Sequence, residues 1–364
     1  MKTRAALFHG TGRPLEVREL DLDEPRGGEV LVRMAAVGIC GTDLHVVKGD
    51  WQRPTPMVLG HEGAGVVEAV GPGVAHLAEG DRVVLSWAPS CGKCADCRRG
   101  SPAACLSLQR AIGAGTLPDG TTGMSLDGET VYRGTATGAL SERLVVAEGS
   151  ALPLGDDVPL EQAALLGCAA LTGVGAAIFA ADVRPGSSAL VVGAGGVGQF
   201  VVQGARIAQA ERIVAVDPVE ARREACLQLG ATDAFAPEEL ADALPGLAPD
   251  GVDYSFDAVG HPETTALALR WTRNGGHCMV VGLPAAGERL DLDPGEFVRR
   301  EKHLTGTMYG SIDPAEALPV LLEHVREGRL ELASMVGPSF PLDEVNDAFD
   351  ASLAGAPGRV LVTP

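Results

Sequence analysis

Four cysteines within fifteen residues constrain the fold of this chain more than any other feature. They are Cys91, Cys94, Cys97 and Cys105, and the surrounding loop, residues 89–102, is polar and contains glycine. Such a loop cannot fold around an apolar core of its own, but a bound metal can supply the missing free energy. Four thiolates close a tetrahedron around zinc and leave no open position for chemistry. The spacing predicts a structural zinc lobe at residues 89–106, with an iron–sulfur cluster as the alternative.

The apolar pattern changes part-way along the 364 residues, a length that suits two domains. Up to about residue 151, short alternating apolar runs are separated by Gly and Pro, which predicts β-rich structure. Beyond about residue 171, strand-length runs alternate with helical stretches, the βαβ pattern of a parallel sheet covered by helices. We therefore expect an α/β chain whose first part is β-rich and whose later part is a doubly wound parallel sheet, followed by a tail after about residue 311.

The charge balance excludes two classes of partner. The chain has 29 Lys and Arg residues and 48 Asp and Glu residues, which gives a formal net charge of −19. This charge repels nucleic acid and anionic membranes. Residues 163–181 carry no charge, but they are rich in Ala and Gly, so a buried helix pair is expected there rather than a membrane span. The apolar run near the N-terminus is too short for a signal peptide. We predict a cytoplasmic protein with neither nucleic acid nor membrane as a partner.

A glycine-rich loop lies between a strand-like run and a helical stretch of the second domain. Its residues, Gly193-Ala194-Gly195-Gly196-Val197-Gly198, fit Gly-x-Gly-x-x-Gly, in which backbone and helix N-terminus approach a pyrophosphate. Asp217 follows 19 residues after Gly198, where a carboxylate can accept from the ribose hydroxyls of NAD and repel the extra phosphate of NADP. Arg222 is one helical turn further on, and it either covers the adenosine ribose or is an ordinary solvated side chain. The pattern predicts an NAD site, with a ligand-free turn as the alternative.

Cys40, His61 and Cys168 each lie beside glycine at the end of an apolar segment. A mixed set of three protein ligands with one open position is typical of catalytic zinc. Cys168 is more than a hundred residues from His61, however, and an isolated Cys is more often a small buried apolar residue. Spacing alone leaves a Cys₂His site as one possibility.

These residues together resemble the zinc-containing medium-chain dehydrogenase/reductase family of alcohol dehydrogenases. The resemblance covers essentially the whole chain and includes the four-cysteine loop, the glycine-rich loop, Leu166-Gly167-Cys168, Gly38-Ile39-Cys40-Gly41-Thr42-Asp43-Leu44-His45 and Gly60-His61-Glu62-Gly63-Ala64-Gly65-Val66-Val67. It implies a GroES-like catalytic domain over residues 1–169 and 312–364 together with a Rossmann domain over residues 170–311. Two Zn²⁺ per chain and NAD are implied as well. It also implies exchange between a small-molecule alcohol and its aldehyde, in a homodimer or homotetramer.

The resemblance assigns roles around the catalytic zinc, which Cys40, His61 and Cys168 would hold. Asp43 would fix the ring of His61, and Glu62 would approach the metal when coordination changes. Thr42 would bond the alcohol hydroxyl, and His45 would complete a proton path to solvent. The implied cofactor contacts, besides the glycine-rich loop, Asp217 and Arg222, are Thr172 and Val197 at the nicotinamide, Arg359 at the pyrophosphate, and Val281.

Some positions depart from known members. The long segment 106–138 resembles that of class I and class III enzymes and their bacterial relatives. Class III enzymes act on a glutathione adduct of formaldehyde. They have an acidic residue at the position of Trp51 and an arginine at the position of Gln109, and this chain has neither. That substrate is therefore not expected. Gly41 replaces a basic residue of class I, which predicts weaker cofactor binding.

Trp51 and Trp87 are expected to line the pocket, although two core tryptophans are the alternative. Bulky aromatic side chains favour an apolar or aryl primary alcohol. Other hypotheses are a nicotinoprotein that never releases NAD, a polyol, amino-alcohol or secondary-alcohol dehydrogenase, and a nonenzymatic dinucleotide-binding protein with only the structural zinc.

Overall fold

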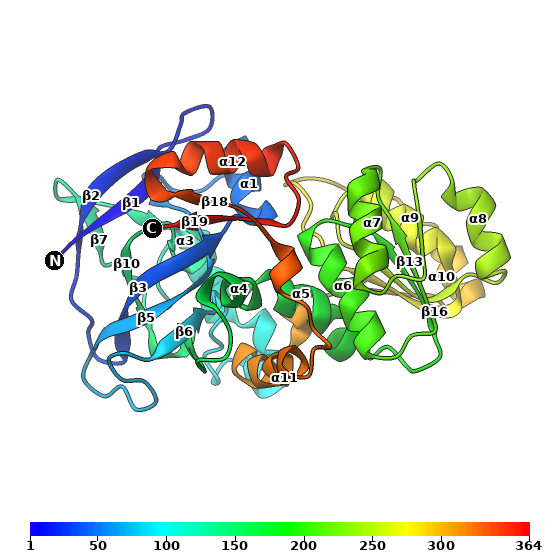
Figure 1. Cartoon of the computed structure of the whole chain (residues 1–364), viewed down its shortest axis with the longest axis horizontal. Coiled ribbons are helices and arrows are strands. Elements are labelled where there is room, and N and C mark those ends of the chain that lie inside the picture. The colour runs from blue at the N-terminus through cyan, green and yellow to red at the C-terminus, as the bar shows by residue number, and fades with distance from the viewer. The chain divides into compact units, whose positions relative to one another are not determined.

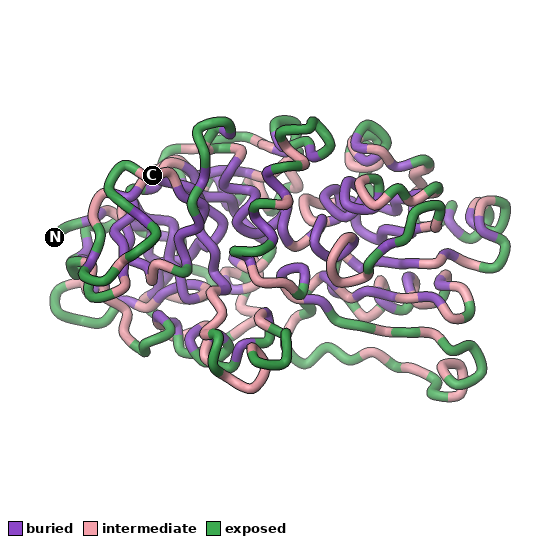
Figure 2. The backbone as a smooth tube through the Cα atoms, turned by 90° about the horizontal axis from the view of Figure 1, so that it is seen from below, coloured by how far each residue is buried: buried purple, intermediate pink, exposed green.

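The computed structural model describes all 364 residues, and the chain divides into two compact units (Figure 1). The first unit comprises Met1–Cys168, Asp313–Leu322 and Leu332–Pro364. The second unit comprises Ala169–Ile312 and Glu323–Glu331. Figure 2 shows buried residues mainly along the interior parts of the backbone and exposed residues mainly along its outer turns.

The first unit holds two sheets. Six strands run in the order β8-β7-β2-β1-β4-β9: β1 (Lys2–Phe8), β2 (Glu16–Leu22), β4 (Met57–Val58), β7 (Met124–Leu126), β8 (Glu129–Thr130) and β9 (Tyr132–Arg133). Seven strands form the other sheet in the order β11-β6-β5-β3-β19-β18, with β10 also paired to β3: β3 (Glu29–Gly38), β5 (Glu62–Val70), β6 (Arg82–Leu85), β10 (Arg143–Ala147), β11 (Ala151–Leu154), β18 (Val336–Pro341) and β19 (Arg359–Thr363).

Register in the seven-stranded sheet determines which loops meet. Strands β3 and β5 are antiparallel, and Gly38 at the end of β3 pairs with Glu62 at the start of β5. Strand β19 pairs antiparallel with the same end of β3, with Leu361 opposite Gly38. The residues just beyond these positions, which include Cys40 and His61, therefore lie at one edge of the sheet although they are distant in sequence.

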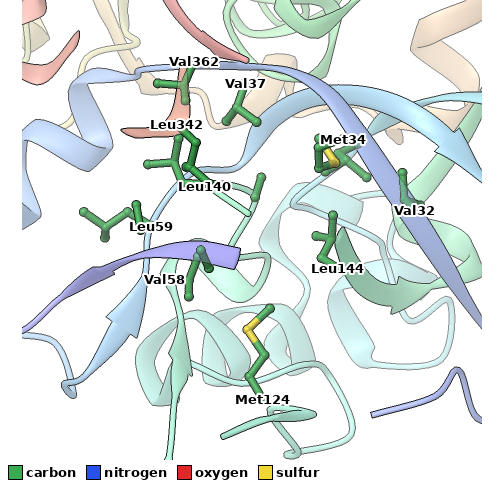
Figure 3. Packing of buried hydrophobic residues seen from close by; sticks show 14 of the residues in the cluster. Val32, Met34, Val37, Val58, Leu59, Met124, Leu140, Leu144, Leu342 and Val362 are labelled. Atoms are coloured by element: carbon green, nitrogen blue, oxygen red, sulfur yellow. The ribbon is translucent and has the colours of Figure 1, made fainter. Parts of the chain in front are cut away.

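The sheets of the first unit enclose an apolar core, part of which is drawn in Figure 3. Val37 of β3 and Val362 of β19 occupy paired positions and point into it. Leu140 and Leu144 come from the segment that leads into and forms β10, and all four side chains are almost fully buried. Burying an aliphatic side chain of this size contributes about 1.5–3 kcal/mol. The core therefore holds the strand ends that carry Cys40 and His61.

The second unit is built on a six-stranded parallel sheet with the order β14-β13-β12-β15-β16-β17. Its strands are β12 (Ser188–Val192), β13 (Arg212–Val216), β14 (Asp233–Phe235), β15 (Val252–Asp257), β16 (Thr272–Val280) and β17 (His303–Gly306). This is the strand order of a doubly wound dinucleotide-binding sheet, in which ligands bind beyond the carboxyl ends of the strands where the order reverses. Here the order reverses between β12 and β15.

The helices are short. Those of the first unit are α1 (Gly41–Lys48), α2 (Ala95–Arg98), α3 (Leu106–Ala114), α4 (Leu160–Ala163) and α12 (Val345–Leu353). Those of the second unit are α5 (Ala169–Gly175), α6 (Gly196–Ile207), α7 (Glu220–Leu229), α8 (Leu240–Leu247), α9 (Pro262–Trp271) and α10 (Pro294–Arg300), and α11 (Pro314–Arg326) has residues in both units.

No single helix of the chain combines the length and apolar character needed to cross a membrane. One pair, Leu160–Gly167 and Ala169–Ala180, would pass on length and composition, but the two helices are bent by 52° relative to each other. Most side chains of this pair are buried within the protein, as expected for core helices.

Candidate active site and metal centres

Cys40, His61 and Cys168 converge in the first unit. Cys40 precedes α1, His61 precedes β5, and Cys168 follows a 3₁₀ turn at Ala164–Gly167. Cys40, His61 and Cys168 are 7%, 1% and 6% exposed, respectively. Their potential ligand atoms all lie within 4.8 Å of one another. The register of β3 and β5 brings the first two together, and the turn adds the third.

The spacing of these donors fits a zinc ion. The Cys168 Sγ lies 3.5 Å from the His61 Nε2. Zinc bonds of about 2.3 Å to sulfur and about 2.0 Å to nitrogen, at a tetrahedral angle, put such a pair about 3.5 Å apart. Three buried ligands of mixed type leave one corner of the tetrahedron for water or a substrate oxygen, as in catalytic zinc sites.

Asp43 ties the two ligand segments together. Its Oδ2 accepts from the Cys40 backbone N–H at 3.1 Å, and its Oδ1 accepts from the Gly60 N–H at 3.0 Å. The same Oδ1 lies 3.4 Å from the His61 Nδ1. Burial alone lowers the pKa of His61, but the Asp43 carboxylate reverses that effect and raises the pKa well above its ordinary value. Asp43 therefore orients the imidazole with Nε2 toward the two thiols.

The two cysteine thiols interact with each other inside the protein. The hydrogen bond from Cys168 holds the pKa of Cys40 well below its ordinary value, against the effect of burial. The same bond, together with burial, raises the pKa of Cys168 well above its ordinary value. Both cysteines would have to be thiolates to bind zinc, so metal binding at this site would release protons.

Glu62 and Arg359 form a buried ion pair beside these ligands. The Arg359 Nε lies 2.8 Å from the Glu62 Oε1, and Nη2 donates to Oε2 at 3.1 Å. Nη1 donates to the carbonyl of Ile39 at 3.1 Å, so the guanidinium holds the segment that leads to Cys40. Burial raises the pKa of Glu62 to about 7, although the Arg359 charge opposes the shift. Arg359 thus contacts protein groups here, and its pyrophosphate contact stays a prediction.

The four-cysteine cluster forms in the first unit, with its sulfur atoms all within 4.8 Å of one another. The Sγ of Cys97 lies 3.9 Å from that of Cys91 and 3.4 Å from that of Cys94. Sulfurs on one zinc ion are about 3.8 Å apart, so the spacing fits a single ion rather than a cluster of several irons. Backbone N–H groups of Lys93 and Cys94 lower the pKa of Cys91 to about 6, whereas burial raises that of Cys97 to about 12.

The glycine-rich loop of the second unit joins β12 to α6. Gly193 has a φ of 93°, a conformation that favours glycine. A Cβ on Gly198 would lie 1.7 Å from the Gly193 carbonyl oxygen, so only glycine allows the turn to close. Helix α6 then begins at Gly196 with no side-chain cap, which leaves backbone N–H groups available to an anion.

Asp217 has a structural task that the sequence did not reveal. Its Oδ2 accepts from the Ala194 N–H and its Oδ1 from the Val219 N–H, both at 2.8 Å. The carboxylate thus joins the glycine-rich loop to the end of β13. Its remaining lone pairs can still accept from ribose hydroxyls, since a carboxylate has about four acceptor sites. Arg222 Nη1 lies 3.8 Å from Oδ2.

The other predicted cofactor residues also lie in the second unit. Thr172 is half-buried in α5, and Val197 is half-buried in the first turn of α6. Val281 is buried directly after β16, where its N–H donates to the Asp257 carbonyl at 2.9 Å.

Comparison with known proteins identifies the family of this chain. Residues 26–159 match the family described as alcohol dehydrogenase GroES-like domain, and residues 196–326 match the family described as zinc-binding dehydrogenase. An S-(hydroxymethyl)glutathione dehydrogenase of Synechocystis sp. is 38% identical over 356 residues, which is 96% of each chain. The chain belongs to the zinc-containing medium-chain family of alcohol dehydrogenases.

Two solved structures share this fold over all of the chain and 99% of their own. An alcohol dehydrogenase zinc-binding domain protein from Burkholderia ambifaria has a TM-score of 0.94 at 35% identity. Benzyl alcohol dehydrogenase from Acinetobacter calcoaceticus has a TM-score of 0.94 at 32% identity. The predicted combination of a GroES-like domain with a Rossmann domain is thereby confirmed.

The residues that family resemblance places near the alcohol lie around α1 and around the cluster of Cys40, His61 and Cys168. Thr42 is half-buried in the first turn of α1. The Trp87 ring meets the His61 ring edge-on, with centroids 6.2 Å apart and planes at 87°. Trp51 stacks on His45 with centroids 4.7 Å apart.

Gln109 and Asp50 also belong to the first unit. Gln109 is an exposed residue of α3. Sequence reasoning missed Asp50, whose carboxylate contacts His45; its position directly after the glycine that ends α1 was the available signal.

Proposed function

We propose that this member of the family is an NAD-dependent zinc alcohol dehydrogenase that interconverts an apolar or aryl primary alcohol and its aldehyde. The observation that carries the proposal is the buried convergence of Cys40, His61 and Cys168, a three-ligand set with one open position. A protein that only binds a dinucleotide has no need of this second, open metal site.

Several residues of the first unit have separate roles in the proposed oxidation of the alcohol. A zinc ion held by these three ligands would supply Lewis acidity that lowers the pKa of a hydroxyl group. Asp43 holds His61 in orientation, and the Glu62–Arg359 pair braces the segment before Cys40. Thr42 hydrogen-bonds the alcohol hydroxyl, and His45, partly exposed, passes the proton to solvent. NAD bound to the second unit would accept the hydride.

Asp217→Asn is expected to weaken the discrimination between NAD and NADP. It removes the charge that repels the additional phosphate, so the ratio of kcat/KM for NADP to that for NAD should rise about tenfold or more. Steady-state kinetics with both cofactors measure the ratio. Asp233→Asn, on β14 of the same sheet and paired with Arg212 at 2.9 Å, is the matched control and should leave the ratio unchanged. An unchanged ratio in Asp217→Asn would remove Asp217 as the selecting residue.

A substrate panel tests the apolar pocket that we attribute to Trp51 and Trp87. Benzyl alcohol and a medium-chain primary alcohol should give kcat/KM values at least about tenfold above those of sorbitol and threonine, because apolar contact discriminates by about 1–3 kcal/mol. S-(hydroxymethyl)glutathione belongs in the panel because a relative carries that name. Trp51 and Gln109 supply no charge to bind its glutathione group, so it should be a poor substrate. Preference for sorbitol or for the glutathione adduct would contradict the assignment of the pocket.

A further inference from the structure

His45 and Asp50, at the C-terminal end of α1, are joined twice. The Asp50 backbone N–H donates to the His45 carbonyl at 2.9 Å. The Asp50 Oδ2 lies 2.7 Å from the His45 Nδ1. The two side chains are 27% and 32% exposed, so the pair is accessible to water yet held by the fold.

The helix end fixes where Asp50 lies. Gly49 has a φ of 84°, and its N–H donates to the Val46 carbonyl at 3.1 Å. The bond from Asp50 N–H back to His45, five residues earlier, completes a Schellman cap. A Cβ on Gly49 would lie 2.8 Å from the Thr11 Oγ1, so the turn is restricted to glycine by crowding as well as by φ. The backbone thus delivers the carboxylate to the imidazole.

The face of the imidazole is held as well as its edge. The Trp51 ring stacks on it with an interplanar angle of 24°, and the Arg53 guanidinium carbon lies 5.7 Å from the Trp51 ring centroid. Nε2 of His45 makes no hydrogen bond within the chain. The His45 ring is therefore held in place, with Nδ1 bonded to Asp50 and Nε2 available to accept a proton.

A carboxylate can only accept hydrogen bonds, so its partner nitrogen must carry a proton. With the proton on Nδ1, the lone pair of a neutral imidazole is on Nε2. When Nε2 takes up a proton, Nδ1 keeps its own and the Asp50 charge balances the imidazolium. The proton then leaves Nε2 for water, and no other bond changes.

We propose that Asp50 is a positioning residue that keeps Nε2 of His45 as the proton acceptor during alcohol oxidation. This inference rests on the proposed function, in which the proton lost by the alcohol hydroxyl passes to solvent through His45.

The tautomer of His45 is the first readout, because a merely structural carboxylate would not change it. Nitrogen-15 NMR of the full-length protein with labelled histidine, recorded at about pH 9, distinguishes the two neutral tautomers. The His45 signals are identified by their loss in His45→Gln. We expect Nδ1–H in the parent and a mixture of tautomers in Asp50→Ala. An unchanged His45 tautomer in Asp50→Ala would overturn the positioning role while leaving the proposed function intact.

Kinetics provide the second readout. Asp50→Ala should lower kcat for alcohol oxidation about tenfold, a fraction of what a positioned base contributes, with KM for NAD within about twofold. In a His45→Gln background the same change should have no further effect, because the two residues act as one unit. Asp21→Ala, which removes a carboxylate 2.9 Å from Lys2 on the same unit, is the matched control and should retain parental kcat.

The possible failures have different signatures. Additive losses in the double variant would show that Asp50 acts independently of His45 and would overturn the inference. Turnover by His45→Gln at the parental rate would instead remove the proton route of the proposed function, and the role of Asp50 with it.

Discussion

His61→Ala is expected to abolish alcohol oxidation while leaving a folded protein. The variant loses one of three ligands from a buried site, and Lewis-acid stabilisation of several kcal/mol corresponds to a fall in kcat of about a thousandfold or more. Metal analysis should give one zinc ion fewer per chain than the parent, and far-UV circular dichroism should match the parent. Near-normal turnover by a variant that has lost this zinc would refute the proposed function.

Cys40→Ser provides the same test with less disturbance of packing, because only a sulfur is exchanged for an oxygen. Cys40 is the N-cap residue of α1, a position at which serine is favourable. The matched control is Cys278→Ser in the second unit, which alters a fully buried thiol remote in sequence from every proposed ligand. Loss of turnover in Cys40→Ser but not in Cys278→Ser would assign the effect to the metal site.

Cys94→Ser is expected to lower thermal stability before it affects chemistry. The polar lobe at residues 89–106 has little apolar core, so loss of its zinc should cost several kcal/mol and lower the Tm by about 5 °C or more. Cys94 is also the N-cap of α2, where it accepts from the Cys97 N–H at 3.5 Å, and serine is a favourable cap. A lower Tm would therefore report the lost metal rather than a lost cap.

Metal content and kinetics complete this test. Cys94→Ser should lose one zinc ion and, assayed well below its Tm, keep a kcat within about twofold of the parent, because a closed four-sulfur site takes no part in chemistry. A variant that melts like the parent would contradict the structural assignment. A variant that retains its fold but loses turnover would indicate that this ion, too, acts in catalysis.

Local features could be predicted well from the sequence. The four-cysteine loop and the glycine-rich loop each lie within a short segment, so residue spacing alone limits their geometry. The strand and helix on either side of Gly193–Gly198 follow from local periodicity. Sequence comparison then confirmed the family and the two-domain fold.

Contacts between distant segments could not be predicted from spacing. Cys168 reaches His61 because the turn that precedes Cys168 packs against strands of the sheet whose register positions His61, and the two side chains lie 3.5 Å apart. Resemblance had suggested that pairing, but it gave no sign that Asp217 bonds the Ala194 N–H or that Asp50 holds His45. These two contacts depend on the direction in which a backbone turn points the side chain of the aspartate.

The sequence by itself determined which residue types could bind metal, the set of four thiolates in one loop and the dinucleotide-binding loop. Residues that are close in the chain must also be close in space. The tertiary structure decided which distant donors share a site and which charges are already engaged, as in the buried pair of Glu62 and Arg359. The physical reason is that chain connectivity restricts only nearby residues. Burial of the apolar core and the pairing of strands fix the positions of all the others.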